Sequence, residues 1–239
     1  MFYFFFGLII GSFLNVVIYR IPRGESIAFP PSHCPSCQHR LGVWDLIPVL
    51  SYVFLRGRCR YCRSWINPRY PLVELITGFL TLLWAAKFQS DLSAIMTLVF
   101  LYILLVIGFI DYERQIIPNL IVLPATILFL LYRLYQGQLL DALIGGLLGG
   151  GFLLIIALLY PKGMGMGDVK LMTMAGALLG WEKVITAIFL GSFIGTVILL
   201  PFLCLNKITR KTALPFGPFL VFALVIMVFK NDVITFILS

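Results

Sequence analysis

The amino-acid sequence predicts an all-α protein that crosses a membrane several times. Of its 239 residues, 61% are hydrophobic and only 12% are charged, and the mean hydropathy is +1.02. A water-soluble domain needs a larger polar fraction to cover its surface. Apolar runs long enough to cross about 30 Å of hydrocarbon, roughly 20 residues each, recur along the chain. This composition excludes a soluble globular protein.

About eight apolar runs are candidate transmembrane helices. They cover residues 2–19, 70–86, 94–110, 116–135, 139–160, 163–180, 184–205 and 216–229, the last with an extension to residue 238. The first run lacks a basic segment and a small-residue cleavage site, so we expect it to stay as a helix. Glycines recur at helical spacing, as in Gly7 and Gly11 or Gly145 and Gly149. We expect these glycines to permit close helix packing.

The distribution of Lys and Arg predicts the orientation, because short cytoplasmic loops retain basic residues. Residues 21–69 carry many arginines against only Glu25 and Asp45. We therefore expect this segment in the cytoplasm and both ends of the chain on the opposite side. Topology then explains most of the net charge of +8, which we do not interpret as a sign of nucleic-acid binding.

Four of the five cysteines form two pairs in this segment, "CPSC" (Cys34, Cys37) and "CRYC" (Cys59, Cys62). The gap between the pairs is slightly longer than in a usual zinc ribbon. Together they offer four thiolates for a tetrahedral structural zinc. Disulfides are the alternative, which a reducing cytoplasm disfavours. Two nearby histidines could substitute as ligands, but we interpret them as polar loop residues (His33, His39).

Two of the ten carboxylates are candidates for chemistry. Asp111 directly follows the third apolar run, and Asp168 lies inside the sixth. Threading the runs through the membrane places both at the cytoplasmic face. If the sixth helix starts near Gly163, Asp168 lies about 7 Å into it. An acid at that depth is costly and indicates a functional site. The alternative is a helix-end aspartate stabilised by the helix dipole and paired with Lys162 or Lys170.

Asp111 and Asp168 could act together as a catalytic pair. If helix packing brings Asp111 and Asp168 close, both cannot ionise easily, so the pair holds one acid and one base. Such a dyad can activate water against a peptide carbonyl. The glycines before Asp168, Gly165 and Gly167, let the backbone approach a substrate chain closely. A dyad at this face can reach a bond just outside an apolar helix.

Four ordered motifs resemble those of a known family. The segment "GMGDVKLMTMAGALLG" resembles the Gly-x-Gly-Asp motif of the aspartic membrane proteases, and "DYERQIIPN" resembles its partner motif, in which an aspartate is followed by Ile-Pro. With "GSFLNVVIYRIPRGES" and the cysteine loop added, the sequence resembles the bacterial type IV prepilin peptidases from about residue 11 to residue 180. Asn119 departs from the pattern, because many relatives have Asp there. We interpret this position as peripheral.

The resemblance implies an aspartic endopeptidase of the bacterial cytoplasmic membrane, with catalytic Asp111 and Asp168 facing the cytoplasm. It would cut after a glycine, between the basic leader and the hydrophobic helix of a prepilin or pseudopilin. It would also methylate the new N-terminus from S-adenosylmethionine, although the loop has no glycine-rich fingerprint of its own for this cofactor. The predicted substrate-binding residues are Glu74, Glu113, Gly165, Gly167 and Lys170. Asp45 and Glu74 lie in segments that also match the family, with structural roles as the alternative.

The predicted organisation has three parts. Residues 1–20 form the first transmembrane helix, residues 21–69 the zinc-binding loop and methyltransferase region, and residues 70–239 the transmembrane peptidase domain. The expected partners are prepilins or pseudopilins and membrane lipid, with no nucleic acid, because aromatic residues in the basic loop are few.

Two other classes of function stay open. A proton-coupled transporter could use the carboxylates as a relay, and "GGLLGGG" at residues 145–151 would suit a flexible span. No clear inverted repeat supports it, and both aspartates fall near one face. An assembly scaffold could dock partners through the zinc ribbon, with structural aspartates. Only the peptidase would cleave a peptide bond without a gradient or a partner.

Overall fold

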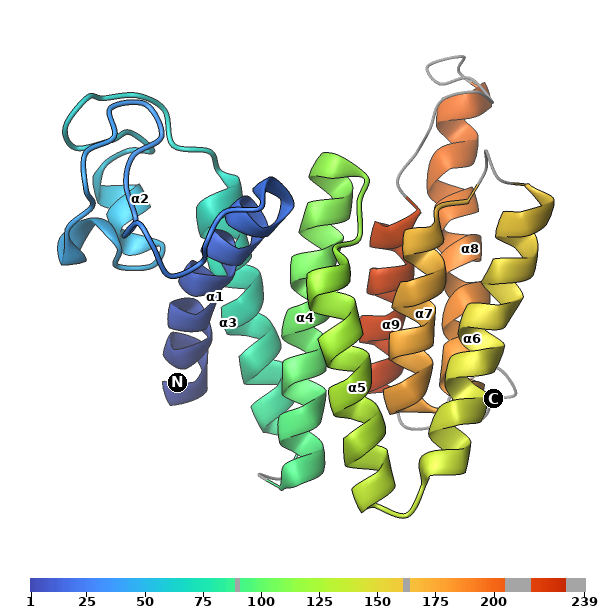
Figure 1. The fold of residues 1–239 in the computed structure, drawn as a ribbon. Helices are drawn as coiled ribbons and strands as arrows, with labels where there is room; N and C mark the ends of the chain where they lie inside the picture. Colours follow the sequence, from blue (N-terminus) through green and yellow to red (C-terminus); the bar gives the residue numbers. More distant parts are fainter. Residues whose placement is uncertain (89–90, 161–163, 205–215, 231–239) are drawn as a thin grey trace. The chain divides into compact units, whose positions relative to one another are not determined.

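The protein is all-helical, as predicted, throughout the residues that the computed structural model describes, namely 1–88, 91–160, 164–204 and 216–230 (Figure 1). In these ranges the only extended pairings are two isolated β-bridges in the cysteine loop. The chain divides into two compact units, Met1–Tyr102 and Ile103–Ser239. Helix α4 (Leu92–Arg114) begins in the first unit and ends in the second.

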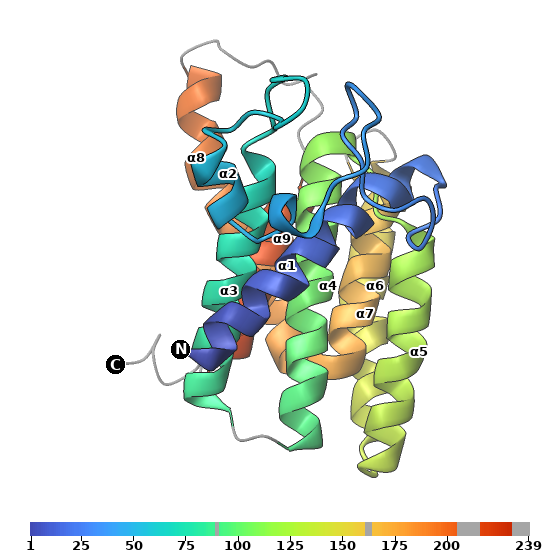
Figure 2. The ribbon, with the colours of Figure 1, turned by 90° about the vertical axis from the view of Figure 1, so that its left-hand side faces the viewer.

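In the first unit, helices α1 (Phe2–Arg20) and α3 (Arg69–Lys87) lie side by side (Figure 2). The cysteine loop connects them and contains the short helix α2 (Leu50–Phe54). A Cβ on Gly7 would lie 2.5 Å from Thr81 Oγ1, and one on Gly11 would lie 2.7 Å from Glu74 Cα. Since neither position has room for a side chain, the predicted packing role of these glycines is confirmed.

The second unit contains the end of α4 together with α5 (Asn119–Tyr135), α6 (Leu139–Leu159), α7 (Met166–Leu179), α8 (Trp181–Cys204) and α9 (Gly217–Phe229). Helix α7 contacts α5, α6, α8 and α9. Leu171, Met172 and Met174 of α7 are fully buried. A Cβ on Gly149 of α6 would lie 2.9 Å from the carbonyl oxygen of Met172. Helix α7 is therefore the core of this unit, and glycines bring α6 against its backbone.

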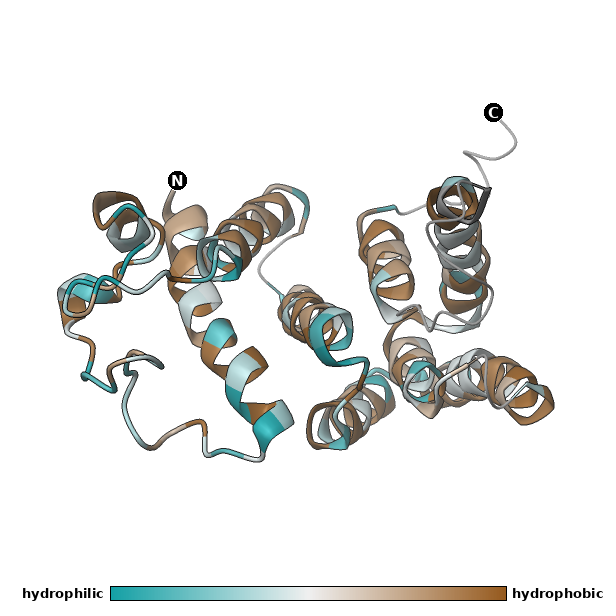
Figure 3. Ribbon diagram, turned by 90° about the horizontal axis from the view of Figure 1, so that it is seen from above, coloured by the Kyte–Doolittle hydropathy of each residue, from teal (hydrophilic) through white to brown (hydrophobic). Residues whose placement is uncertain are grey.

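Four helical segments are long and apolar enough to cross a membrane by length and composition, namely Phe2–Arg23, Leu92–Arg114, Leu139–Leu159 and Trp181–Pro201. Helices α5 and α9 are apolar but shorter. Hydrophobic residues line the helices of both units (Figure 3). Every predicted apolar run contains a helix, while the number that cross the bilayer stays a prediction.

Three predicted helix starts were wrong, each by three residues. One is that of α8, which begins at Trp181 rather than at residue 184. Helix α5 begins at Asn119 rather than at residue 116, because Pro118 is extended and disfavours helix before it. Helix α7 begins at Met166, after Gly165 in an extended conformation. Asp168 is thus only about 3 Å along its helix, at 1.5 Å per residue, and the predicted depth was too large. Lys162, Gly163 and the predicted extension to residue 238 lie outside the described residues.

Candidate active site and cysteine cluster

Asp111 and Asp168 lie near each other in the second unit, although they are distant in the sequence. Asp111 is in the last turn of α4 and Asp168 in the first turn of α7. Each exposes only 6% of its surface. They are close enough for the charge of Asp111 to act on Asp168. The predicted pair therefore shares one buried region of one unit.

The Asp111 carboxylate faces the start of α9. Gly217 is the first residue of that helix, and a Cβ there would lie 2.5 Å from Asp111 Oδ2. The backbone N–H of Gly217 also interacts with the carboxylate. Among the described residues Oδ2 has no hydrogen-bond partner. The sequence interpretation missed Gly217, although the Gly-Pro step that opens the last apolar run marks a helix start.

The segments that contain Asp111 and Asp168 contact each other through residues that follow or precede the two aspartates in the sequence. A Cβ on Gly167 would lie 3.0 Å from Ile117 Cβ. Lys170 Nζ donates a hydrogen bond to Asn119 Oδ1 at 2.8 Å. These contacts join the start of α7 to the α4–α5 connection. Asn119, the position that departs from the family pattern, therefore lies next to a predicted substrate-binding residue.

The remaining predicted substrate-binding residues have different surroundings. The described neighbours of Gly165 leave room for a side chain, because a Cβ there would lie 3.8 Å from the nearest of them. Glu113 is exposed on α4 in the second unit. Glu74 belongs to the first unit, is buried and accepts the backbone N–H of Val49 at 2.7 Å. This bond ties α3 to the cysteine loop and favours the structural alternative for Glu74.

The four predicted metal ligands come together in the first unit. The Sγ atoms of Cys34, Cys37, Cys59 and Cys62 all lie within 4.8 Å of one another. All four are free thiols, with Cys34 and Cys59 buried and the other two exposed. Four sulfur donors are typical of zinc or iron–sulfur sites. The cysteines thus form a candidate metal site.

The two cysteine pairs have the same backbone conformation. In each, the first cysteine N–H donates to the carbonyl five residues later, and its own carbonyl accepts an N–H four residues later. The bonds are Cys34 to His39 at 3.0 Å, Gln38 to Cys34 at 2.8 Å, Cys59 to Ser64 at 2.8 Å and Arg63 to Cys59 at 3.0 Å. Gln38 and Arg63 both adopt positive φ, at 58° and 61°. This repeat turns both cysteines of each pair toward one centre.

The thiols influence each other's ionisation. Burial opposes ionisation of Cys34, but hydrogen bonds from the backbone of Cys37 and Ser36 outweigh it and lower the pKa of Cys34 to about 6. Although the His39 backbone acts the other way, burial and the neighbouring cysteines raise the pKa of Cys37 to about 11. Neighbouring thiolates repel each other, and a bound cation would remove this repulsion. The donor set and its electrostatics therefore fit a metal ion.

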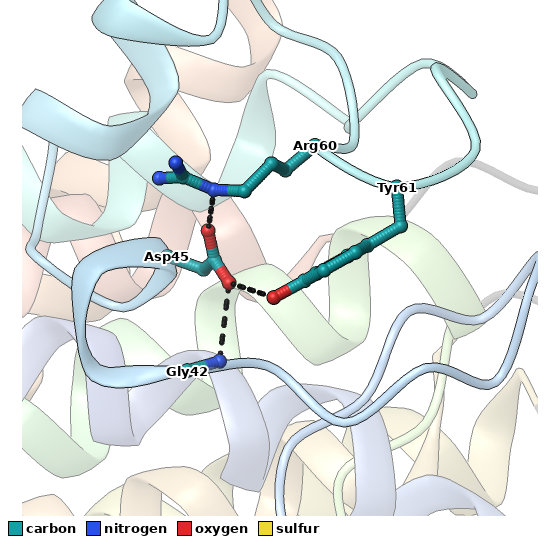
Figure 4. Close-up of polar contacts among 4 residues, drawn as sticks. All are labelled: Gly42, Asp45, Arg60 and Tyr61. Carbon is teal, nitrogen blue, oxygen red and sulfur yellow. Dashed lines mark hydrogen bonds and ion pairs between the residues drawn. The ribbon is translucent and has the colours of Figure 1, made fainter.

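Asp45 holds the second cysteine pair in place (Figure 4). Its carboxylate accepts hydrogen bonds from Arg60 Nε at 2.6 Å, Tyr61 Oη at 3.2 Å and the Gly42 N–H at 3.1 Å. Arg60 and Tyr61 lie between the two cysteines of "CRYC". Burial acts to raise the pKa of Asp45, but these contacts, led by Arg60, lower it overall. The geometry favours the structural alternative for this residue.

The neighbouring histidines have other contacts. The His39 ring lies 3.6 Å from the Tyr61 ring between centroids, and His33 Nδ1 lies 3.0 Å from the carbonyl oxygen of Pro31. The metal-ligand group contains neither histidine. The interpretation of both as loop residues is consistent with these contacts.

The fold and the sites define a multi-pass helical membrane protein with a buried carboxylate pair in one unit and a four-cysteine cluster in the other. Residues 5–88 match the Bacterial Peptidase A24 N-terminal domain, and residues 98–200 match the Type IV leader peptidase family. The chain belongs to this family. The prediction made from the four motifs is therefore confirmed.

Similarity to relatives covers nearly the whole chain. Proteins named prepilin leader peptidase/N-methyltransferase from Pseudomonas putida and Aeromonas hydrophila are each 34% identical to it, over 95% and 97% of this chain and 88% and 91% of their own lengths. The protein of that name from Pseudomonas aeruginosa is also 34% identical, over 96% of this chain. No solved structure matches the chain. The expected end of the similarity near residue 180 was wrong, because the match continues into the last helices.

Proposed function

We propose that the chain removes the leader peptide of type IV prepilins or pseudopilins and then methylates the new N-terminus. Near full-length similarity to prepilin leader peptidase/N-methyltransferases supports this activity. The observation that carries the assignment of the site is the buried pair Asp111 and Asp168, which interact across two helices of the unit that contains most of the leader-peptidase match.

The peptidase step uses the two carboxyl groups as one acid and one base. The ionised member takes a proton from water, whose oxygen attacks the carbonyl carbon of the scissile bond. The protonated member donates a hydrogen bond to the carbonyl oxygen, which becomes negatively charged as the new bond forms. The C–N bond then breaks, and a proton passes to the leaving amine. No covalent intermediate with the enzyme is needed.

Other residues of the second unit would position the substrate. Glu113 is exposed two residues after Asp111 in the sequence and can attract the basic leader by charge. Lys170, Gly165 and Gly167 lie beside Asp168 in the sequence and line the start of α7. Glu74 stands apart from this group, because its carboxylate already accepts a backbone N–H.

The methyltransferase step is assigned to the cysteine loop, residues 21–69, in the segment that matches the Peptidase A24 N-terminal domain. S-adenosylmethionine would supply the methyl group to the free amine of the cleaved pilin. The amine would gain the methyl group and lose one proton, and S-adenosylhomocysteine would be the other product.

The four cysteines would hold a structural zinc ion. Zinc–sulfur bonds of about 2.3 Å in a tetrahedron place the sulfur atoms about 3.8 Å apart. The Sγ atoms of Cys34 and Cys62 are 3.9 Å apart. A closed four-sulfur site leaves no position for substrate, so its role is to hold the loop together.

We further assign the eight apolar helices as membrane spans and residues 70–239 as the transmembrane peptidase domain, which includes α3 of the first unit as well as the second unit. The arginine-rich cysteine loop and both aspartates then face the bacterial cytoplasm, by the positive-inside rule. The leader of a prepilin, kept inside by its own basic residues, would be cut at this face. Membrane lipid and the pilin are the proposed partners, without nucleic acid.

Purified protein in detergent, incubated with a model prepilin and analysed by mass spectrometry, tests this function. We expect Asp111→Asn and Asp168→Asn each to lower kcat by about 10²- to 10⁴-fold. Asp91→Asn is the matched control, because Asp91 caps α4 through the Ala94 N–H and asparagine caps equally well. Full cleavage by either site variant would refute the dyad. A peptidase needs neither a gradient nor a partner to cleave. If the wild-type protein does not cleave the prepilin, the transporter and the scaffold are the remaining hypotheses.

A further inference from the structure

The first residue of α9, Gly217, packs against the side chain of Asp111. A Cβ on Gly217 would lie 2.5 Å from Asp111 Oδ2 and 2.9 Å from its Cγ. Real Cβ atoms essentially never lie closer than 3.0 Å to a heavy atom outside their own and the adjoining residues. The carboxylate of Asp111 therefore occupies the space that any side chain at position 217 would need.

Space, rather than backbone conformation, requires glycine here. Gly217 is not among the described glycines with positive φ, which are Gly24, Gly57, Gly137 and Gly180. It is the first residue of a helix, and an alanine could adopt that conformation without strain. The effect of a side chain at this position would thus come from the contact with Asp111.

Helix packing prevents α9 from moving away. One turn further along both helices, a Cβ on Gly108 of α4 would lie 3.2 Å from Val221 Cγ1 of α9. Leu220 and Leu224 of α9 are fully buried. The backbone of α9 is thus held along its length, whereas an aspartate side chain turns about two single bonds. A larger residue at 217 would displace the carboxylate rather than the helix.

The polar contacts point to the same relationship. Asp111 Oδ2 is buried and has no hydrogen-bond partner among the described residues, while the Gly217 N–H interacts with the carboxylate. Oδ2 itself is therefore not held by a hydrogen bond from the described residues. Both observations place the backbone of Gly217 next to the Asp111 carboxylate.

We propose that Gly217 is a positioning residue of the peptidase site, which holds the Asp111 carboxylate in the orientation in which it acts together with Asp168. This inference rests on the proposed peptidase function. It adds the first turn of α9 as a third element of the site, beside the end of α4 and the start of α7. Gly217 acts through Asp111 and does not itself touch the reacting atoms.

Gly217→Ala, compared with Gly195→Ala, tests this role. Gly195 of α8 also faces α9, but its Cβ would lie 3.4 Å from Phe219, an ordinary contact. We would measure kcat and KM for a model prepilin between about pH 5 and pH 9, and the thermal unfolding midpoint of each full-length protein. Displacement of a reacting group by about 1 Å can lower the rate by about 10²-fold. We expect Gly217→Ala to lower kcat by about this factor, with KM and the unfolding midpoint near wild type.

The pH dependence of kcat distinguishes positioning from a loss of folded protein. Moving the carboxylate away from the Gly217 N–H should shift the pH of maximal kcat, whereas a smaller folded fraction would lower kcat equally at every pH. Gly195→Ala should leave both unchanged. The inference is overturned if Gly217→Ala keeps the wild-type kcat, or if its loss is uniform across pH and matches the loss of folded protein. Failure of the wild-type protein to cleave would instead refute the proposed function.

Discussion

Gly167 packs directly against Ile117, so the Gly-x-Gly-Asp motif and the Ile-Pro motif touch in the structure. The distance from a Cβ on Gly167 to Ile117 Cβ would be 3.0 Å, at the edge of what real structures show. Because Ile117 Cβ is bonded to the backbone, it cannot turn aside as a side-chain end can. The contact thus fixes the start of α7 relative to the segment that follows Asp111.

Replacing Gly167 with valine should force these two segments apart. We expect Gly167→Val to destabilise the protein by about 1–3 kcal/mol, as overpacking typically does, and to lower kcat because Asp168 is the next residue. Unfolding midpoints and prepilin cleavage would be measured in detergent. Gly151→Val is the control, since a Cβ at Gly151 has no heavy atom within 4 Å. Equal effects of the two substitutions would contradict the prediction.

Glu113→Gln should weaken binding of the basic leader more than it slows cleavage. Glu113 is exposed two residues after Asp111, and an exposed ion pair contributes about 0.2–1 kcal/mol. At low salt we therefore expect KM to rise by up to about five-fold, with kcat unchanged. A model prepilin whose leader lysines and arginines are replaced by glutamine is the control substrate, for which the effect should vanish. An unchanged KM at low salt would remove this role.

The cysteine cluster should carry one zinc ion per chain. We expect Cys34→Ser to lose bound zinc and to lower the unfolding midpoint, because Cys34 is buried and offers one of the four clustered sulfur atoms. Elemental analysis of the purified protein measures the metal. Cys204→Ser is the control, since Cys204 is outside the cysteine loop in the sequence. Equal zinc content in the two variants would refute the four-sulfur site.

The contribution of Asp45 to stability should depend on pH. Its contacts with Arg60, Tyr61 and Gly42 lower its pKa below the ordinary 3.8. A carboxyl group whose pKa is lowered on folding stabilises the protein fully above its unfolded pKa, and this stabilisation is lost as pH falls through the folded pKa. We expect Asp45→Asn to have a lower unfolding midpoint than wild type near neutral pH, with the difference shrinking below about pH 4.

Asp91→Asn serves as the comparison for this experiment, because asparagine preserves the helix cap at that position. The unfolding midpoint of Asp91→Asn should differ little from that of the wild type at every pH. A difference between Asp45→Asn and wild type that stays constant down to the lowest pH would show that the charge of Asp45 does not contribute.

Local sequence patterns were enough to predict the helical class, the apolar segments and the two cysteine pairs. Hydropathy and cysteine spacing are properties of neighbouring residues, so they are visible without a fold. Helix starts were predicted less accurately, as at Asn119 and Met166, because the extended residues Pro118 and Gly165 interrupt apolar runs that continue on both sides. Asp111 and Asp168 could be identified from the sequence as candidate catalytic residues. Whether their side chains lie close together depends on how the helices pack.

The sequence by itself determined that this is a membrane protein of the leader peptidase family with two candidate acids and four candidate metal ligands. Only the tertiary structure decided that Asp111 and Asp168 share a buried region, that Gly217 forms a wall beside Asp111, and that Glu74 and Asp45 hold the cysteine loop. Such relationships join residues far apart in the chain. They depend on how closely helices approach, which is set by side-chain volumes and glycines on both partners.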